Sequence, residues 1–555
     1  MCMSINYSVR IISICILVLF TSLGVAQDRP NIIFILTDDQ SFNLLGATGN
    51  KVVQTPNIDQ LAQDGILFKN AYVTSAICTP SRVSILLSQF ERKHGVNFNS
   101  GTSVSDEAWA QSYPVIMRKN GYYTGWIGKN HAPIGRGGYQ SGVMEKSFDY
   151  WYAGHGHLRF YPKNVHPIFN DAVADTQAEI INESVAAFLD PNARKLEGAI
   201  HFLKNRPKEK PFVLSINFNL PHGAGTSSME LKDSDDEIYK SLYRDIQIPL
   251  PQNYIAKVDI RTPKLPSDLL RVEDRQKGYD YVDTPETIKE RQIRELQAMT
   301  GIDRVVGNIV TQLKKLKLHK NTVIIFTSDH GLFGGQYGLG GKALCYEQVT
   351  HVPFIIYDPN APKKQRGIIS DALVQTIDVG PTMLSYANIP RPKTFQGKSL
   401  KPIVYGTKTT VRDFIYTENL WSTHFGNPLC ESVQNKTWKY IRYYKNNTFS
   451  ATKKIKYAKE MKMKVNDMLY GVYTPDIAVY RDLVERPLNG EQPVYEELYH
   501  LKEDPLELKN EINNPELKHI VEQLREQWKT EITFARGQGN AKVYPYTLNL
   551  YPKTK

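Results

Sequence analysis

Three long apolar runs mark the first two thirds of the chain, at residues 31–37, 212–217 and 323–327. Runs of this length without a charged residue are typical of strands buried on both faces, as in parallel sheets. Between the last two, residues 286–316 repeat apolar side chains at steps of three or four, which predicts an amphipathic helix. The polar stretch 223–283 has no such period and is either an excursion over the active face or a surface insertion. Strands alternating with helices predict an α/β fold with a doubly wound sheet.

The pattern changes in the last quarter of the chain. Residues 438–443 and 495–499 alternate and are rich in aromatic side chains, which predicts antiparallel strands. Residues 515–528 have the period of an amphipathic helix. We therefore predict a large α/β domain over residues 27–417 and a smaller C-terminal α+β domain over residues 418–555 that completes the substrate cleft.

The first 26 residues have the pattern of a secretory signal peptide. Arg10 precedes the apolar run 11–20, and Gly24-Val25-Ala26 supplies the small residues of a cleavage site. The apolar run is too short to cross a bilayer, so we expect no stable membrane insertion, and an N-terminal anchor is the alternative. The expected location is the periplasm or the medium of a bacterium.

Composition and charge narrow the class of protein. With 41% hydrophobic and 23% charged residues, a disordered, collagenous or coiled-coil chain is excluded. The net charge of +11 admits nucleic acid, an anionic membrane or an acidic substrate as a partner. No nucleic-acid-binding motif accompanies the charge, so we expect no nucleic-acid partner. Loss of the signal peptide leaves Cys78, Cys345 and Cys430, and whether the last two form a disulfide stays open.

Polar pairs follow all three predicted strands. Asp38-Asp39 ends the first, Pro221-His222 follows the second, and Asp329-His330 ends the third. Ligands of open α/β sheets bind outside the carboxyl ends of the strands, although Asp at such positions also caps turns. Three carboxylates brought together there would repel one another without a divalent cation between them. Their oxygens favour Ca²⁺ or Mg²⁺ over zinc, and His330 fits a hard cation less well.

Cys78-Thr79-Pro80-Ser81-Arg82 lies about forty residues beyond the first strand end. A second motif runs from Gly121 through Lys129 to His131, and Lys342 follows a glycine pair. With these motifs the chain resembles the type I sulfatases of the alkaline phosphatase superfamily over essentially its whole mature length. It departs from that pattern at Ser88, where the family usually has Gly, and at Asn130, where it favours an aromatic residue. The third departure is His330, where the fourth metal ligand is commonly Asn.

The resemblance implies the fold, the chemistry and the role of each site residue. The fold would be the mixed doubly wound sheet of that superfamily. Cys78 would be converted to Cα-formylglycine by a formylglycine-generating or anaerobic sulfatase-maturating enzyme. Its hydrated form would attack sulfur and give a covalent enzyme sulfate. The implied catalytic residues are Cys78, Arg82, Lys129, His131, His222 and Lys342. The implied ligands of Ca²⁺, with Mg²⁺ as the alternative, are Asp38, Asp39, Cys78, Asp329 and His330.

Substrate contacts are harder to assign from the sequence. A basic and aromatic stretch contains His155, His157 and Arg159, which would bind the sugar or form a solvated loop. Arg92 and His94, just past the Cys78 motif, are further candidates.

We expect an exported sulfatase acting on an algal polysaccharide of the ulvan, carrageenan or fucan type, or on glycosaminoglycan oligosaccharides. The alternatives are a formylglycine-type phosphodiesterase or phosphonate monoester hydrolase, and a non-catalytic protein that binds sulfated glycans.

Overall fold

The computed structural model describes most of the chain beyond the predicted signal peptide. The described residues are 29–96, 102–154, 198–222, 241–270, 279–420, 427–444, 485–539 and 541–545. The predicted signal peptide and the candidate substrate residues His155, His157 and Arg159 lie outside these ranges. Among the described helices, none combines the length and the apolar character needed to span a bilayer.

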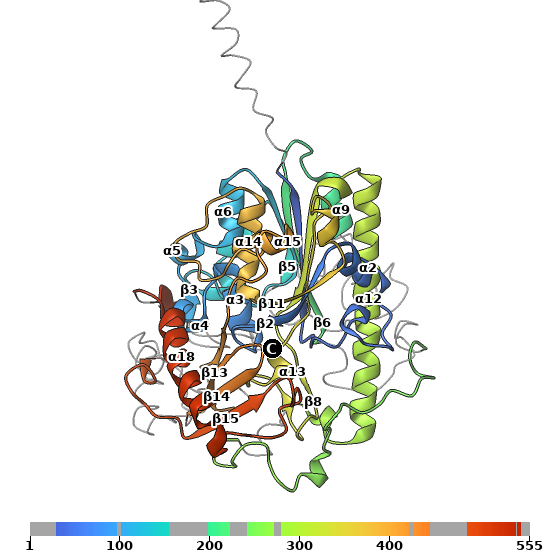
Figure 1. The fold of residues 1–555 in the computed structure, drawn as a ribbon. Helices are drawn as coiled ribbons and strands as arrows, with labels where there is room; N and C mark the ends of the chain where they lie inside the picture. The colour runs from blue at the N-terminus through green and yellow to red at the C-terminus, as the bar shows by residue number, and fades with distance from the viewer. Residues whose placement is uncertain are drawn as a thin grey trace, which may run out of the picture.

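The centre of the molecule is an eight-stranded mixed sheet (Figure 1). In spatial order its strands are β11 (Ile368–Gln375), β2 (Ile66–Tyr72), β10 (Phe354–Tyr357), β7 (Thr322–Ser328), β1 (Asn31–Asp38), β6 (Phe212–Pro221), β4 (Tyr123–Lys129) and β5 (Tyr150–Gly154). β10 runs antiparallel to both of its neighbours, and the other pairs are parallel. The three predicted strands are β1, β6 and β7, which lie side by side, and the predicted α/β fold class is confirmed.

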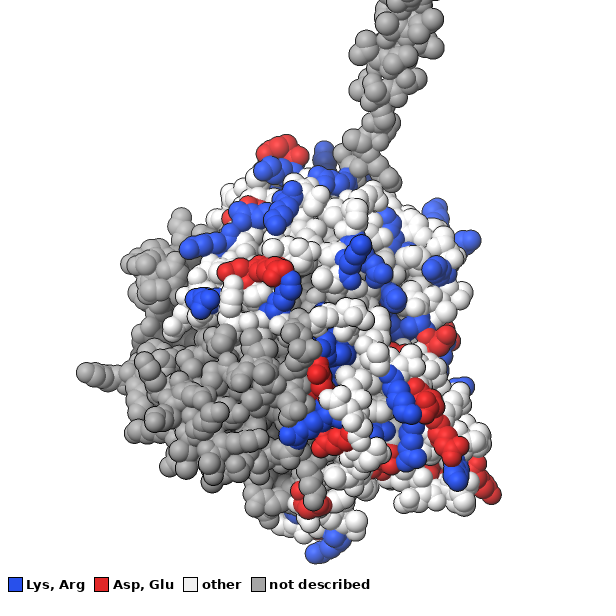
Figure 2. Space-filling model, turned by 90° about the vertical axis from the view of Figure 1, so that its left-hand side faces the viewer, with Lys and Arg blue, Asp and Glu red and all other residues white. Residues whose placement is uncertain are grey.

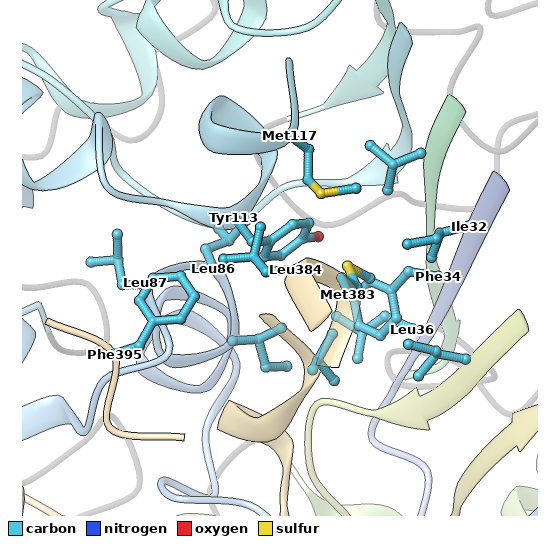
Figure 3. Packing of buried hydrophobic residues seen from close by; sticks show 14 of the residues in the cluster. Ile32, Phe34, Leu36, Leu86, Leu87, Tyr113, Met117, Met383, Leu384 and Phe395 are labelled. Atoms are coloured by element: carbon cyan, nitrogen blue, oxygen red, sulfur yellow. The ribbon is translucent and has the colours of Figure 1, made fainter. Parts of the chain in front are cut away.

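Helices cover both faces of this sheet, as a doubly wound fold requires (Figure 1). One layer consists of α3 (Cys78–Leu87), α6 (Tyr113–Lys119) and α14 (Val379–Tyr386), and the other of α2 (Pro56–Asp64), α9 (Ala199–Asn205) and α12 (Pro285–Lys315). β1 serves both layers because successive side chains point to opposite faces. Ile32 and Phe34 pack in the first layer (Figure 3), and Ile33 and Ile35 in the second. A strand that is apolar on both faces therefore lies at the middle of the fold.

The helix predicted over residues 286–316 is α12. Pro285 is its first residue, and the side chain of Thr284 caps it by accepting a hydrogen bond from the backbone N–H of Thr287 at 3.3 Å. Shorter elements fill the connections: η1 (Gly46–Thr48), α4 (Glu91–His94), α5 (Asp106–Trp109), η2 (Gly138–Gln140), α7 (Val143–Lys146), η6 (Lys257–Asp259), η7 (Asp280–Val282), η8 (His319–Asn321), β8 (Phe333–Gly334), β9 (Gly340–Gly341), α13 (Glu347–Thr350), η9 (Lys363–Gln365), η10 (Thr376–Asp378) and α15 (Lys401–Val404).

A second, four-stranded antiparallel sheet forms the C-terminal part, together with α18 (Lys518–Arg536) and η12 (Pro515–Leu517). Its strands are β12 (Ile415–Asn419), β13 (Leu429–Gln434), β14 (Trp438–Tyr444) and β15 (Tyr495–His500). β14 and β15 are the strands predicted from the aromatic alternation. β12 already pairs with β13 from Ile415 onward, so the small sheet begins within the last residues of the predicted large domain. The last described strand, β16 (Val543–Pro545), returns to pair with β3 (Thr102–Val104) of the large part.

Buried ion clusters join the small sheet to the large part. Arg92 of α4 donates to Glu418 at 3.0 Å and to Glu431, and both carboxylates belong to the small sheet. Lys439 of β14 lies between Glu507 and Glu347, at 2.9 and 2.7 Å. Both cationic side chains are fully buried. The two parts also share an apolar cluster, so they form one continuous core rather than two separable units.

Replacing Arg92 by Met should destabilise the protein by about 3–5 kcal/mol, because Glu418 and Glu431 would keep their buried charges without a counterion. Urea denaturation monitored by circular dichroism measures this loss. The matched control is Lys529→Met, which removes a cation from an exposed pair with Glu526 and should change stability by less than about 0.5 kcal/mol. Equal effects of the two substitutions would contradict the role given to the buried cluster.

Candidate active site

The site lies at the carboxyl ends of four neighbouring parallel strands. In the order β7, β1, β6 and β4, these strands end beside Asp329-His330, Asp38-Asp39, His222 and Lys129. Parallel strands bring their carboxyl ends to one edge of a sheet, and polar residues following each strand therefore converge there. The clustering predicted from three strand ends is what the structure shows, with β4 adding a fourth.

Cys78 is the first residue of α3 and is completely buried. Its Sγ lies 3.2 Å from the Nε2 of His330, 3.2 Å from the Nζ of Lys342 and 3.7 Å from a carboxylate oxygen of Asp38. Burial alone would raise the pKa of the thiol, but the charges of Lys129 and Lys342 outweigh it and hold that pKa below its ordinary value. The segment therefore places a reactive side chain at the centre of the cluster.

Four side chains could hold a metal ion together. Ligand atoms of Asp38, Asp39, Cys78 and His330 all lie within 4.8 Å of one another, and all four residues are buried. The fifth predicted ligand, Asp329, lies against this group with its carboxylate turned to Arg82, whose Nε donates to it at 2.8 Å. Carboxylate oxygens this close together, with an imidazole beside them, are a donor set that fits a divalent cation.

Three cationic side chains surround the carboxylates. Lys129 and Arg82 pair with Asp38, Arg82 at 3.6 Å, and Lys342 pairs with Asp39 at 2.7 Å. Burial by itself lowers the pKa of Lys342, but the neighbouring Asp39 and Cys78 raise it well above the ordinary value. Three fixed positive charges thus balance the three carboxylates, so a divalent cation would leave the pocket with a positive excess suited to an anion.

Negative charge also controls the protonation of His330. Burial lowers the pKa of this imidazole, and the carboxylate of Asp329 opposes burial and raises the pKa to about 9. Its Nδ1 lies 3.2 Å from Asp39, and its Nε2 lies 3.6 Å from Asp329. The two carboxylates favour positive charge at this position, and a bound divalent cation would supply that charge with a neutral His330 as its ligand.

Two further imidazoles border the cluster. His222 follows β6, and its Nε2 lies 3.6 Å from a carboxylate oxygen of Asp39. His131 is buried after β4 and stacks on Tyr139, with ring centroids 6.2 Å apart. Burial and the charges of Lys129 and Arg82 hold the pKa of His131 well below its ordinary value. A neutral His131 is able to accept a proton, whereas the side chain of His222 is 16% exposed and lies beside the carboxylate of Asp39.

Backbone strain collects at the site. Asp39, His131 and Ala343, which follows Lys342, have φ values of 62°, 53° and 64°. Non-glycine residues seldom occupy this left-handed region, and such strain persists where the surroundings over-determine it. The strain is located where functional side chains must point in one direction.

Arg291 of α12 is a site residue that the sequence did not reveal. Its guanidinium donates to the backbone carbonyls of Pro221 and His222 at 3.1 and 3.3 Å, and its Nε donates to Glu295 at 2.7 Å. An Arg–Glu pair four residues apart is an ordinary surface pattern on a helix, so no sequence signal distinguished it. In the structure Arg291 is fully buried and Glu295 is partly exposed, and the guanidinium holds the turn that carries His222.

His94 has a different environment from the one predicted. It is 3% exposed, its Nε2 lies 3.0 Å from the Oγ of Ser84, and its Nδ1 accepts a hydrogen bond from the backbone N–H of Val96 at 3.1 Å. Both ring nitrogens are therefore occupied inside the protein, which corrects the expectation that His94 binds substrate. Burial lowers its pKa to about 3.

Arg92 likewise serves the buried ion cluster and not a substrate pocket.

Ser88 explains one departure from the family pattern. It ends α3 with φ 51°, a conformation that glycine adopts without strain. Its hydroxyl donates to the carbonyl of Ile377 at 2.7 Å and accepts from the N–H of Gly397 at 3.1 Å. The side chain thus makes two buried hydrogen bonds that a glycine would lack.

A cavity of about 350 Å³ adjoins Asp39. It lies between the β1–α2 connection, the first half of α12 and the segment after β7. Amide side chains are frequent on its wall, namely Asn43, Asn50, Gln292, Gln336 and Gln348. Most of these amides already hydrogen-bond within the protein, as Gln292 does to Pro249 and Gln348 to Ser41. The rest of the wall is mainly apolar, so the cavity is a mixed one that suits a ligand with both apolar and polar faces.

Comparison with known proteins gives two family matches. Residues 30–389 match the Sulfatase family, and residues 335–474 match the family described as N-sulphoglucosamine sulphohydrolase, C-terminal. Relatives include an N-acetylglucosamine-6-O-sulfatase of Bacteroides thetaiotaomicron, 26% identical over 90% of this chain and 87% of the relative. An ulvan-active sulfatase of Formosa agariphila is 27% identical over 93% of this chain and 81% of its own.

Solved structures share the fold. One, in complex with its substrate D-glucosamine-2-N,6-O-disulfate, has a TM-score of 0.65 and 21% identity, covering 93% of this chain and all of its own. A phosphonate monoester hydrolase of Agrobacterium radiobacter has a TM-score of 0.63 and 18% identity, covering 91% of this chain and 95% of its own.

Because His94 is buried and neutral, the stability of the folded protein should decrease as the pH becomes acidic. Because its pKa is about 3 in the folded protein and about 6.5 in the unfolded chain, its contribution is complete above pH 6.5 and falls as pH drops toward 3. The expected slope from this residue is about 1.4 kcal/mol per pH unit. His94→Gln should therefore flatten the fall in urea midpoint between pH 6.5 and 5, whereas His519→Gln at an exposed position should leave it unchanged. If the urea midpoint fell equally with pH in the wild type and in His94→Gln, the prediction would be contradicted.

Proposed function

Because this chain belongs to the sulfatase family, we propose that it is an exported, formylglycine-dependent sulfatase that removes sulfate from sulfated carbohydrate. The family makes it a sulfuric ester hydrolase. One observation supports the formylglycine mechanism most strongly. The Sγ of Cys78 lies within 3.7 Å of a carboxylate, an imidazole and an ammonium group that each have a defined task in sulfate transfer.

In the proposed mechanism, a maturation enzyme supplies the oxidant that converts Cys78 to formylglycine with loss of its sulfur before the protein folds, and the aldehyde then takes up water to give a geminal diol. One hydroxyl attacks the sulfur of the ester, and the sugar alcohol leaves. The second hydroxyl then loses its proton, the aldehyde re-forms, and the bond to sulfate breaks. Arg82 holds this end of α3 because its guanidinium donates to Asp329 at 2.8 Å and to the carbonyl of Lys129 at 3.2 Å.

The cations and imidazoles around Cys78 have distinct tasks in this proposal. Lys342 and Lys129 bind sulfate oxygens in a buried pocket, where charge interactions are strong. His222, at the more open side of the cluster, protonates the leaving alcohol. His131, neutral because of its lowered pKa, accepts a proton from the diol. Arg291 fixes the turn of His222 and is a positioning residue.

We assign the metal as Ca²⁺, with Mg²⁺ as the alternative. Asp38, Asp39, Asp329 and His330 would hold it, together with the oxygen that replaces the Sγ of Cys78. Once bound, the ion supplies positive charge against the sulfate oxygens. Hard carboxylate oxygens dominate the donor set, which favours these ions over zinc.

The proposed substrate is a sulfated sugar. The support is that two relatives are named an N-acetylglucosamine-6-O-sulfatase and an ulvan-active sulfatase, and that a cavity large enough for a sugar ring adjoins Asp39. On the face shown in Figure 2, Lys and Arg side chains are spread over the described surface with acidic residues between them. A diffuse positive charge of this kind attracts a polyanion without defining its sequence.

A phosphonate monoester hydrolase is the second candidate function. The solved structure of such an enzyme shares this fold at a TM-score of 0.63, and a cluster built for a tetrahedral anion can accept phosphorus or sulfur at its centre. The charge of the substrate does not separate the two, because a sulfate monoester and a phosphonate monoester each carry one negative charge near neutrality, so their relative turnover has to be measured. A non-catalytic glycan-binding protein would share the pocket and lack turnover.

Purified protein from a host that matures sulfatases should release inorganic sulfate from sulfated glucosamine or ulvan oligosaccharides. It should turn over phosphate and phosphonate esters of the same alcohol at least tenfold more slowly in kcat/KM. Ion chromatography of the released sulfate, phosphate and phosphonate measures all three rates. If the protein preferred phosphate or phosphonate esters, the second candidate function would replace the first.

The control is Cys78→Ala, which should keep the circular dichroism spectrum and lose all turnover. Conversion of Cys78 to formylglycine should lower the mass of its peptide by about 18 Da.

Chelation should test the metal site independently of turnover. Dialysis against EDTA should lower the melting temperature, and Ca²⁺ should restore it better than Mg²⁺. At free Ca²⁺ a hundredfold above its Kd, the gain is about 2.7 kcal/mol. Asp39→Asn should abolish the Ca²⁺-dependent shift in differential scanning calorimetry, whereas Asp371→Asn, at an exposed surface pair, should retain it. A melting temperature indifferent to Ca²⁺ in the wild type would overturn the assignment.

A further inference from the structure

Two buried thiols face each other where the small sheet meets the large part. The Sγ atoms of Cys345 and Cys430 lie 3.6 Å apart, in van der Waals contact, and both residues have no exposed surface. Cys345 comes three residues after Lys342, and Cys430 lies on β13. Both sulfur atoms are thiols in this structure. The pair therefore spans the boundary between the segment that carries an active-site lysine and the C-terminal sheet.

The surroundings of the thiols connect them to the catalytic segments. The amide nitrogen of Asn419 lies 3.8 Å from the sulfur of Cys345 and 3.9 Å from that of Cys430. The carbonyl oxygen of the same side chain accepts a hydrogen bond from the backbone N–H of Ala76 at 3.1 Å. Ala343 donates in turn to the carbonyl of Ala76 at 2.9 Å. The segments leading to Cys78 and Lys342 thus meet directly beside the thiol pair.

We propose that Cys345 and Cys430 form a disulfide in the exported protein, and that this bond clamps the C-terminal sheet to the segment carrying Lys342. The inference rests on the proposed export, because disulfides persist in oxidising compartments. Cys78 is consumed by maturation, so these are the two cysteines of the mature chain that remain for pairing.

The bond forms by exchange with a protein or small-molecule disulfide as oxidant. One cysteine, as thiolate, attacks a sulfur of the oxidant and releases one oxidant thiol. The second cysteine attacks the resulting mixed disulfide and releases the other. Two cysteine thiols are oxidised, one oxidant disulfide is reduced to two thiols, and two protons pass from the cysteines to the released thiolates.

Burial determines when this reaction takes place. In the folded protein, burial and the neighbouring Cys345 raise the pKa of Cys430 well above its ordinary value, which suppresses the reactive thiolate. Neither sulfur is accessible to an oxidant once β13 has packed. The bond therefore forms while the chain folds after export, and the finished bond is protected from reductants in the native state.

The bond would join residues 85 positions apart. It would restrict the unfolded chain and leave the native contacts in place, because the two sulfur atoms already touch. Stabilisation by a native disulfide generally increases with the length of the loop that it closes. With the bond in place, the small sheet could move away from the large part only if the segment carrying Lys342 moved with it.

The first test is a thiol count on the full chain exported by its own signal peptide and alkylated in denaturant without reductant. We expect no alkylation at Cys345 and Cys430, and a cross-linked peptide pair that separates after reduction. Native protein treated with dithiothreitol should keep the bond until denaturant is added. Alkylation of both thiols in the exported protein would overturn the proposal. This result is independent of turnover, so it is distinct from a failure of the sulfatase assignment.

The second test compares the exported wild type with the Cys345→Ala/Cys430→Ala variant by differential scanning calorimetry. The variant should melt about 5 °C lower, and the same wild type made in a reducing cytosol should melt near the variant. Cys345→Ser/Cys430→Ser is the control for the loss of apolar packing. An oxidised protein that melts with the reduced one would contradict the clamp, even if the bond is detected.

Discussion

The repulsion among buried carboxylates is the constraint on which the rest of this structure depends. Asp38, Asp39 and Asp329 meet in a dry site, where like charges interact strongly. The fold compensates this repulsion with three buried cations and with a donor set, which includes the imidazole of His330, that suits a divalent ion. The same concentration of positive charge that makes the carboxylates tolerable makes the pocket attractive to a sulfate group. The same buried charges therefore determine both the stability of the cluster and its attraction for an anion.

The topology of the eight-stranded sheet brings these charged residues together at one edge of the sheet. β1 is buried on both faces, so its end lies at the middle of the sheet, and β7, β6 and β4 end beside it. The small sheet adds no carboxylate to the cluster, but Asn427 donates to the carbonyls of Lys342 and Ala343 and so supports that segment from the side. The strands end in or directly before Asp38, Asp39, Asp329 and Lys129, and the irregular segment after β9 supplies Lys342, which reaches inward.

Sequence patterns predicted the parts of the fold that have a strong period. β1, β6, β7 and α12 were expected within a few residues, because continuous apolar runs and a long helical repeat leave few alternatives. The strand-end pairs pointed to the edge of the sheet where the polar residues cluster, and the Cys78 motif carried the resemblance from which the proposed chemistry follows. Arg291 and His94 could not be assigned this way. Whether an arginine or a histidine faces solvent, a carbonyl or a hydroxyl depends on tertiary packing, which leaves no local pattern in the sequence.

The pairing of β16 with β3 has a consequence for biosynthesis. Residues 543–545 supply the described partner of residues 102–104, so β3 gains this partner only after the small sheet and α18, which come before β16 in the chain, have been synthesised. The edge of the large part is thus completed by a segment that follows the small sheet. The large part and the C-terminal part are therefore expected to finish folding together.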